Sequence, residues 1–277
     1  MPFHRSSTLV LNVRTAGFRL MLFVVLIVLL FPYFWMLVSS LKTGVQNITS
    51  PLSILFVPTL ENYTNVLTTT EVPVAIGISL LVGIVATLAA LLLGLPAAYG
   101  IARYRLQNIG LVVLVSRMLP GIALLVPWFV LFSRLGLVGS YWALVLSHLT
   151  VTLPLVIWFS IDFFAELPSE LIDAAAVDGC STFQILIRIA IPLARNGILA
   201  AAILAFVHSW NVFLYSLVLG GTLDLAPVAA YNQIREFDTN WGGVNAAAVL
   251  TTWPIIFLAL PFSRALVRGL AAGALKG

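Results

Sequence analysis

Long apolar runs alternate with short polar segments along this chain. A membrane-spanning helix needs roughly 20 apolar residues, and six runs meet that length, at residues 20–38, 74–98, 111–132, 142–161, 198–219 and 246–262. The first run is too long for the core of a signal peptide, and no cleavage pattern of small residues follows it. The pattern therefore predicts an all-α integral membrane protein, with six transmembrane helices in a single domain over residues 1–277.

The composition agrees with that prediction. Hydrophobic residues make up 61% of the chain, charged residues only 9%, and the mean hydropathy is +1.09. A soluble domain is about half apolar and a quarter charged. So little charge cannot cover a water-soluble fold of 277 residues, so lipid must surround most of the surface. The single Cys180 excludes an intrachain disulfide and offers no Cys/His metal motif.

The basic residues orient the chain in the membrane. With the N-terminus inside, ten of the fourteen lysines and arginines lie in cytoplasmic segments, namely Arg5, Arg14, Arg19, Arg103, Arg105, Arg188, Arg195, Arg264, Arg268 and Lys276. The opposite orientation would violate the positive-inside rule. We therefore expect both termini in the cytoplasm. The segment 39–73 would then be an irregular outer cap, because its residues are typical of turns and strands.

One polar stretch, residues 162–197, interrupts the apolar pattern and would be cytoplasmic. Ser169 is a plausible N-cap, Glu170 and Asp173 fall in the favourable first turn, and Gly179 is a natural stop. This predicts a short helix over 170–178. A second helix over 182–191 should end at Pro192.

One face of the short helix would carry Leu171, Ala174, Ala175 and Asp178. The small alanines would let another protein approach the backbone closely. A docking element and an ordinary connecting helix are both compatible with this pattern alone.

The spacing in this stretch resembles a known motif. Asp173-Ala174-Ala175, three residues, Gly179, nine residues and then Ile189-Ala190-Ile191-Pro192 is similar to the EAA motif of ABC importer permeases. That motif has Glu and Leu where this chain has Asp173 and Ile191. The resemblance covers nearly the whole chain and points to the second permease of maltose-type carbohydrate importers, through Ser40-Leu41-Lys42, residues 97–103, residues 131–137, Trp210-Asn211 and the tail 269–277.

The resemblance implies a type I, MetI-like permease fold in the bacterial cytoplasmic (inner) membrane. It implies half of a translocation path for a sugar, sugar derivative or polyol, with a second, non-identical permease, two copies of a cytoplasmic ATPase and an extracytoplasmic solute-binding protein as partners. The chain has no phosphate-binding loop and no catalytic motif, so it is expected not to be an enzyme. ATP and magnesium would be bound by the ATPases, and no cofactor or nucleic acid by this chain.

The resemblance also assigns roles to residues. Those expected to couple to the ATPase are Glu170, Leu171, Asp173, Ala174, Ala175, Asp178, Gly179, Ile189 and Pro192. The tail 264–277 would contact the ATPase through Gly269, Gly273, Lys276 and Gly277, and the outer loop 220–245 would contact the binding protein through Tyr231, Asn232 and Arg235. A frayed end and an ordinary exposed loop are the alternatives for these two segments.

Trp210, Asn211 and Tyr215 are candidates for a substrate path, because they combine stacking and hydrogen-bonding groups within a span. The alternative is that they form hydrogen bonds between helices. Other functions remain open: an ABC permease for a non-sugar solute such as a phosphodiester or polyamine, an ion-coupled transporter, or a membrane-embedded enzyme. The last two lack the expected intramembrane acids and catalytic groups.

Overall fold

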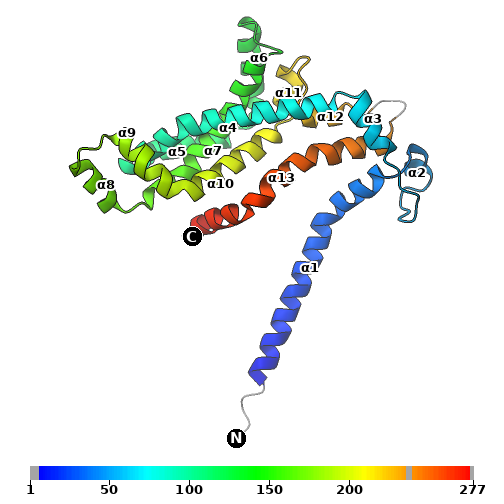
Figure 1. Cartoon of the computed structure of the whole chain (residues 1–277), viewed down its shortest axis with the longest axis horizontal. Coiled ribbons are helices and arrows are strands. Elements are labelled where there is room, and N and C mark those ends of the chain that lie inside the picture. The colour runs from blue at the N-terminus through cyan, green and yellow to red at the C-terminus, as the bar shows by residue number, and fades with distance from the viewer. Residues whose placement is uncertain (1–5, 235–238, 275–277) are drawn as a thin grey trace. The chain divides into compact units, whose positions relative to one another are not determined.

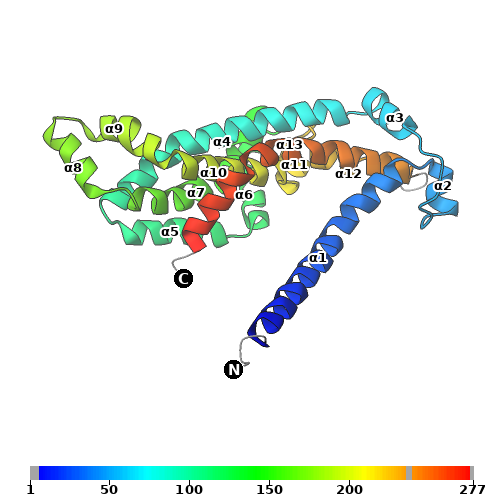
Figure 2. The same ribbon diagram turned by 60° about the horizontal axis from the view of Figure 1, so that its bottom comes forward.

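A computed structural model describes residues 6–234 and 239–274, with side chains for 17–234, 239–258 and 260. The chain divides into two compact units, residues 1–68 with 233–249 and residues 69–232 with 250–277. The described residues form helices and no strands (Figures 1 and 2). The helices are α1 (Ser6–Ser40), α2 (Gly44–Thr49), α3 (Glu61–Thr69), α4 (Val72–Arg103), α5 (Gln107–Met118), α6 (Gly121–Arg134), α7 (Tyr141–Ala165), α8 (Ser169–Val177), α9 (Thr182–Ile185), the π-helical turn η1 (Leu186–Ala190), α10 (Ile191–Trp210), α11 (Leu214–Leu219), α12 (Ala226–Tyr231) and α13 (Trp241–Ala274).

Within the described residues, five helical stretches are long and apolar enough to cross a membrane. They are Gly17–Ser40, Val72–Arg103, Tyr141–Ala165, Thr182–Trp210 and Trp241–Leu258. A sixth is obtained if α5 and α6 together form one span. The prediction of a helical membrane protein is therefore confirmed.

The third predicted span, 111–132, is not a straight helix. It is divided between α5 and α6, which meet at an angle of 87°. Pro120 occupies the N-cap position of α6, and Leu119 before it is extended, with ψ 124°. A proline disfavours the helical conformation of the residue that precedes it. The apolar run therefore continues through a break that hydropathy alone does not reveal.

The fifth span also differs from the prediction of residues 198–219. The helix begins at Thr182 and continues past Pro192 to Trp210, so the expected stop at Pro192 is wrong. A proline cannot donate the usual backbone hydrogen bond, and its ring crowds the preceding turn. The π-helical turn η1 accommodates this, with Ile191 N–H donating to Leu186 O five residues back. The helix then breaks after Trp210, before α11.

The core of the second unit lies where α4, α7 and α10 run side by side (Figures 1 and 2). Small residues allow this close approach. A Cβ added to Gly94 of α4 would lie 3.0 Å from Val156 of α7, and one added to Gly197 of α10 would lie 2.3 Å from the Phe163 ring of α7. Close backbone approach through small residues is how membrane helices commonly pack, since lipid gives them little hydrophobic drive to associate.

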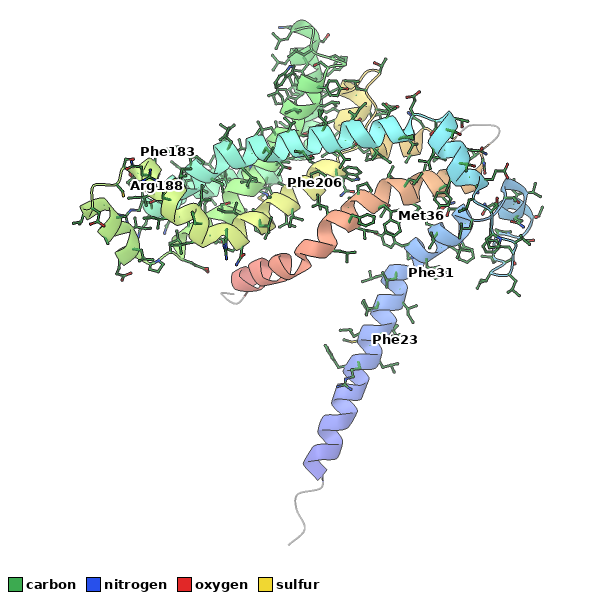
Figure 3. The ribbon with its side chains drawn as sticks, viewed as in Figure 1. Phe23, Phe31, Met36, Phe183, Arg188 and Phe206 are labelled. Carbon is green, nitrogen blue, oxygen red and sulfur yellow. The ribbon has the colours of Figure 1, made fainter. Side chains whose placement is uncertain are left out.

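The first unit contains α1 and the predicted outer cap. Apolar side chains such as Phe23 and Phe31 project from α1 (Figure 3), and most of its described length is exposed within this chain. The cap is more helical than expected, since α2 and α3 lie within it. Thr43 and Gln46 start α2 with a reciprocal capping box, a local signal that satisfies two backbone donors.

A buried lysine fixes the cap to the end of α1. Lys42 is fully buried and its Nζ donates to Pro51 O at 2.7 Å. The Nζ also lies 5.1 Å and 5.4 Å from the ring centroids of Trp35 and Phe56. A buried ammonium needs such compensation. Lys42 therefore serves the structure of the cap.

We predict that Gly197→Ala destabilises the protein and that Gly77→Ala does not. The added methyl at position 197 would meet the Phe163 ring near its base, where the ring cannot swing aside, whereas nothing lies within 4 Å at Gly77 of α4. Overpacking of this kind costs about 1–3 kcal/mol. The thermal unfolding midpoint of the purified protein should fall for Gly197→Ala and stay level or rise for Gly77→Ala. Equal losses in both variants would contradict the close α7–α10 packing.

Candidate functional site

The short helix predicted from the polar stretch is α8, which starts one residue earlier than expected. Ser169 is the first helical residue rather than the N-cap; Pro168 holds that position and makes no side-chain cap. The fixed φ of proline suits the beginning of a helix. Glu170 lies in the first turn, where an acid is favoured by the helix dipole.

The C-terminus of α8 is a Schellman motif. Cys180 N–H donates to Ala175 O at 3.0 Å and Gly179 N–H to Ala176 O at 3.1 Å, while Gly179 has φ +85°. A non-glycine residue in this left-handed conformation costs roughly 1–2 kcal/mol. Gly179 therefore turns the chain sharply from α8 into α9, whose own start is fixed by a Ser181–Gln184 capping box.

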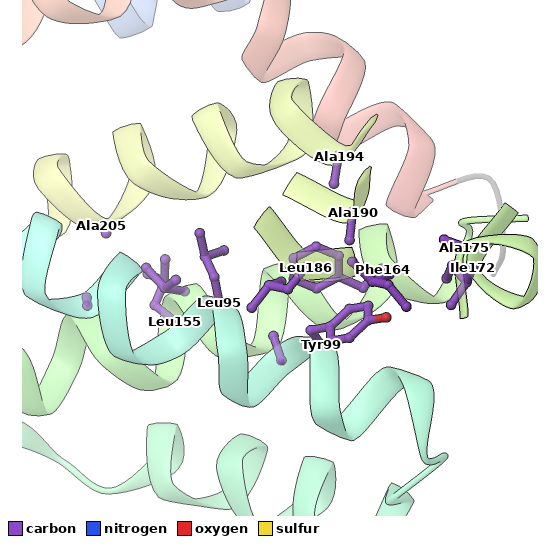
Figure 4. Close-up of a cluster of buried hydrophobic side chains, with 14 residues drawn as sticks. Leu95, Tyr99, Leu155, Phe164, Ile172, Ala175, Leu186, Ala190, Ala194 and Ala205 are labelled. Atoms are coloured by element: carbon purple, nitrogen blue, oxygen red, sulfur yellow. The ribbon is translucent and has the colours of Figure 1, made fainter. Parts of the chain in front are cut away.

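The inner face of α8 packs on the core of the second unit. Ile172 and Ala175 are buried in a cluster with Tyr99 of α4, Phe164 of α7 and Leu186 of η1 (Figure 4). The Tyr99 and Phe164 rings meet edge to face at 5.6 Å. Ala175, expected on an outward docking face, is thus turned inward. The spacing of Ile172 and Ala175, one helical turn apart, is the signal that identifies this inner face.

The outer face of α8 combines acids with exposed apolar side chains. Leu171, Glu170 and Asp178 are exposed, and so is Ala174. Val177 is 88% exposed, and Phe183 of α9 is 68% exposed. Figure 3 labels Phe183. Exposed apolar groups of this size beside polar ones are typical of an interaction surface.

An ion pair joins α8 to the end of α4. Arg103 Nη2 lies 2.7 Å from Asp173 Oδ1, with the two side chains 35% and 61% exposed. At this exposure solvent screens the pair, so it contributes only about 0.2–1 kcal/mol. Its consequence is geometric, because it links α8 to a long apolar helix 70 residues away in sequence. Nothing in the sequence pattern indicated Arg103 as the partner of Asp173.

The second half of the motif lies at the base of α10. Ile189 belongs to η1 and packs partly buried against the core cluster, whereas Pro192 is exposed at the start of α10. Gly269 and Gly273 lie in α13, so the predicted tail is helical as far as Ala274. Lys276, Gly277 and Arg235 are outside the described residues.

The three candidates for a substrate path have different surroundings. Trp210 and Tyr215 are buried; Trp210 Nε1 donates to Thr251 O at 3.2 Å, and Tyr215 Oη donates to Gly121 O at 3.2 Å. Both side chains therefore form hydrogen bonds between helices, which was the alternative to a role in substrate contact. Asn211 is exposed, and its Nδ2 donates to Val207 O at 2.7 Å.

Two of the outer-loop candidates lie within the described residues, and both are exposed. Tyr231 at the end of α12 is 55% exposed, and the Asn232 amide donates to Asp224 Oδ2 at 2.8 Å. Sequence reasoning did not identify the contact between His148 Nδ1 and Ser209 Oγ, at 2.7 Å, which connects α7 to α10 inside the bundle.

Comparison with known proteins decides the family. Residues 90–272 match the model of the family described as binding-protein-dependent transport system inner membrane component. The chain belongs to this family. It is therefore a multi-pass permease component of an ABC transporter in the cytoplasmic membrane.

Similar proteins support the assignment along the whole permease. This chain is 35% identical to the trehalose/maltose transport system permease protein MalG of Thermococcus litoralis, over 91% of this chain and 93% of MalG. It is 34% identical to the sulfoquinovosyl glycerol transport system permease protein SmoH of Agrobacterium fabrum, over 90% and 89%. A bacterial ABC transporter involved in importing the acidic polysaccharide alginate has the same fold, with TM-score 0.77 at 19% identity, over 95% and 99%.

We predict that exchanging the charges of Arg103 and Asp173 is better tolerated than reversing either one. In Arg103→Asp or Asp173→Arg two like charges meet, and uptake should fall by up to roughly fivefold, as expected for an exposed pair. The double variant should recover most of that loss, but not all, because an acid is unfavourable at the C-terminus of α4. The measurement is uptake of the transported solute by cells that carry each variant. The thermal unfolding midpoint of the purified protein reports on its structure.

Arg188→Asp is the matched control, since Arg188 is exposed and forms no ion pair within the described residues. Combining it with Asp173→Arg should give no recovery. If Arg188→Asp restored uptake to the Asp173→Arg variant, or if Arg103→Asp failed to restore it, the role of the Arg103–Asp173 pair would be contradicted.

Proposed function

We propose that this permease is one of two non-identical permeases of an importer for a sugar, a sugar derivative or a polyol, and that α8 couples it to an ATPase. The observation that carries the proposal is the two-sided geometry of α8. Ile172 and Ala175 fix its inner face to the core of α4, α7 and α10, while Leu171 and Val177 on its outer face remain exposed, as does Phe183 of α9. A movement of α8 caused by a partner at its outer face would therefore be transmitted to three apolar helices.

The orientation follows from the basic residues. Arg103, Arg105, Arg188 and Arg195 lie near the end of the bundle that carries α8, and the positive-inside rule assigns that end to the cytoplasm. Both termini would then be cytoplasmic. A cytoplasmic ATPase, present in two copies, would contact α8 and the C-terminal end of α13, and would bind the ATP and magnesium. An extracytoplasmic binding protein would meet the opposite side, where Tyr231 is exposed.

The carbohydrate class rests on the similar proteins. MalG is named for trehalose and maltose, SmoH for sulfoquinovosyl glycerol, and SugB of Mycobacterium tuberculosis, 34% identical over 90% of this chain, for trehalose. The position as second permease rests on the likeness to MalG. A permease for another solute, such as a phosphodiester or polyamine, is the alternative, since the alpha-helical coupling element does not depend on the solute.

Substrate contacts in this chain would be few. Trp210 and Tyr215 are committed to hydrogen bonds between helices, so Asn211 is the best remaining candidate. The partner permease would then supply most of the polar groups that recognise the sugar.

We expect Val177→Asp to remove the ATPase from the purified complex. The substitution would place a charge in the centre of an apolar contact, and burying an unpaired carboxylate is costly. Val45→Asp is the matched control, because Val45 is also a valine in a short helix and is 70% exposed. The measurement is the amount of ATPase that co-purifies with the tagged permease, together with binding-protein-stimulated ATP hydrolysis.

The two variants also test the orientation. If the Val45→Asp permease lost the co-purifying ATPase while the Val177→Asp permease kept it, the orientation in the membrane would be the opposite of the one proposed. Retention in both would overturn the coupling role of α8. Ligand screening of the cognate binding protein would separate a sugar from a non-sugar solute.

A further inference from the structure

A pocket of about 550 Å³ lies beside the last turns of α4 and α7 and the first turns of α5. This volume is within the range of small-molecule binding sites. Its walls include the apolar side chains Ile101, Leu111, Leu114 and Ile161. None of its lining residues belongs to α8 or to the three candidates for a substrate path.

Three polar side chains also line the pocket, and their polar groups have no partner within the described residues. They are Arg105, Gln107 and Asp162. Arg105 and Asp162 carry opposite charges, but they do not form an ion pair, unlike Arg103 and Asp173 nearby. The pocket therefore offers a guanidinium and an amide as donors, and a separate carboxylate as acceptor.

The backbone at Arg105 has a conformation that disfavours a side chain of this kind. The end of α4 is a Schellman motif, with Leu106 N–H donating to Ile101 O at 3.0 Å and Arg105 N–H to Ala102 O at 3.3 Å. Arg105 has φ +51° and is the only non-glycine residue with positive φ in the described chain. Glycine usually fills this position, as Gly179 does at the end of α8. Strained residues of this kind cluster at functional sites.

The position of the pocket indicates an amphiphile as its occupant. It lies at the ends of two membrane-length apolar helices, α4 and α7, where hydrocarbon meets water. Trp158 also lines it, and tryptophan is enriched at that boundary. Apolar walls suit acyl chains, and basic pockets between such helices bind lipid headgroups. Asp162 distinguishes this pocket from a purely basic one.

We propose that the pocket binds a phospholipid whose headgroup carries both a phosphate and a primary ammonium. Arg105 and Gln107 donate to the phosphate, and Asp162 accepts from the ammonium. An anionic headgroup without an ammonium would meet the unpaired Asp162 carboxylate. A quaternary ammonium would have no hydrogen to donate to it.

The intact transport complex is first reconstituted into nanodiscs that contain equal parts of phosphatidylethanolamine, phosphatidylglycerol and phosphatidylcholine. The complex is then extracted from the nanodiscs and purified. The lipids that remain bound are identified by mass spectrometry. The wild type should retain phosphatidylethanolamine in preference to the other two. Arg105→Gly should lower that retention roughly twofold to fivefold, as expected for the loss of an exposed charge contact, yet should fold at least as stably because glycine relieves the positive φ.

Asp162→Asn should shift the preference towards phosphatidylglycerol, since Arg105 still holds the phosphate and the repelling carboxylate is gone. Arg188→Gln and Glu71→Gln are matched controls, because they remove the same charges from exposed residues that do not line the pocket. Both should keep the wild-type preference.

Several results would overturn the proposal. The wild type could retain all three lipids equally or prefer phosphatidylglycerol, or the Arg105→Gly and Asp162→Asn variants could keep the wild-type preference. Displacement of the lipid by soluble glycerophosphoethanolamine would show that the pocket recognises a soluble zwitterion instead of a membrane lipid.

Discussion

The packing of Ile172 and Ala175 onto the ends of α4, α7 and α10 is the interaction on which the rest of the site depends. Burying an isoleucine side chain stabilises by about 1.5–3 kcal/mol, more than the screened Arg103–Asp173 pair contributes. The apolar contact therefore holds α8 in place, and the ion pair aligns it. With its inner face fixed in this way, only the outer face of α8 remains available to a partner.

The sequence predicted the elements that follow from local chemistry. Apolar runs identified the membrane-length helices, and Gly179 identified the end of α8, because a left-handed residue there favours glycine. The spacing from Asp173 to Pro192 led to the correct family. These features depend on residues close together in the chain, so one sequence is enough to recognise them.

The features that the sequence missed depend on how helices accommodate proline and meet one another. Pro120 broke a predicted span, whereas Pro192 was absorbed by a π-helical turn, and no local rule distinguishes the two cases. The inward turn of Ala175 and the pairing of Arg103 with Asp173 require the packed bundle. Trp210 and Tyr215 were candidates for substrate contact because of their chemistry, and the fold uses both to connect helices.

We propose that the outer face of α8 is cytoplasmic and covered by an ATPase. Val177 is 88% exposed, and Cys180 is the only cysteine, so Val177→Cys in a Cys180→Ser background provides one accessible thiol. A membrane-impermeant maleimide should label it in inside-out vesicles but not in intact cells. Labelling should be slow with the ATPase bound and fast once the ATPase is stripped away. Labelling from outside the cell, or at equal rates with and without the ATPase, would contradict the account.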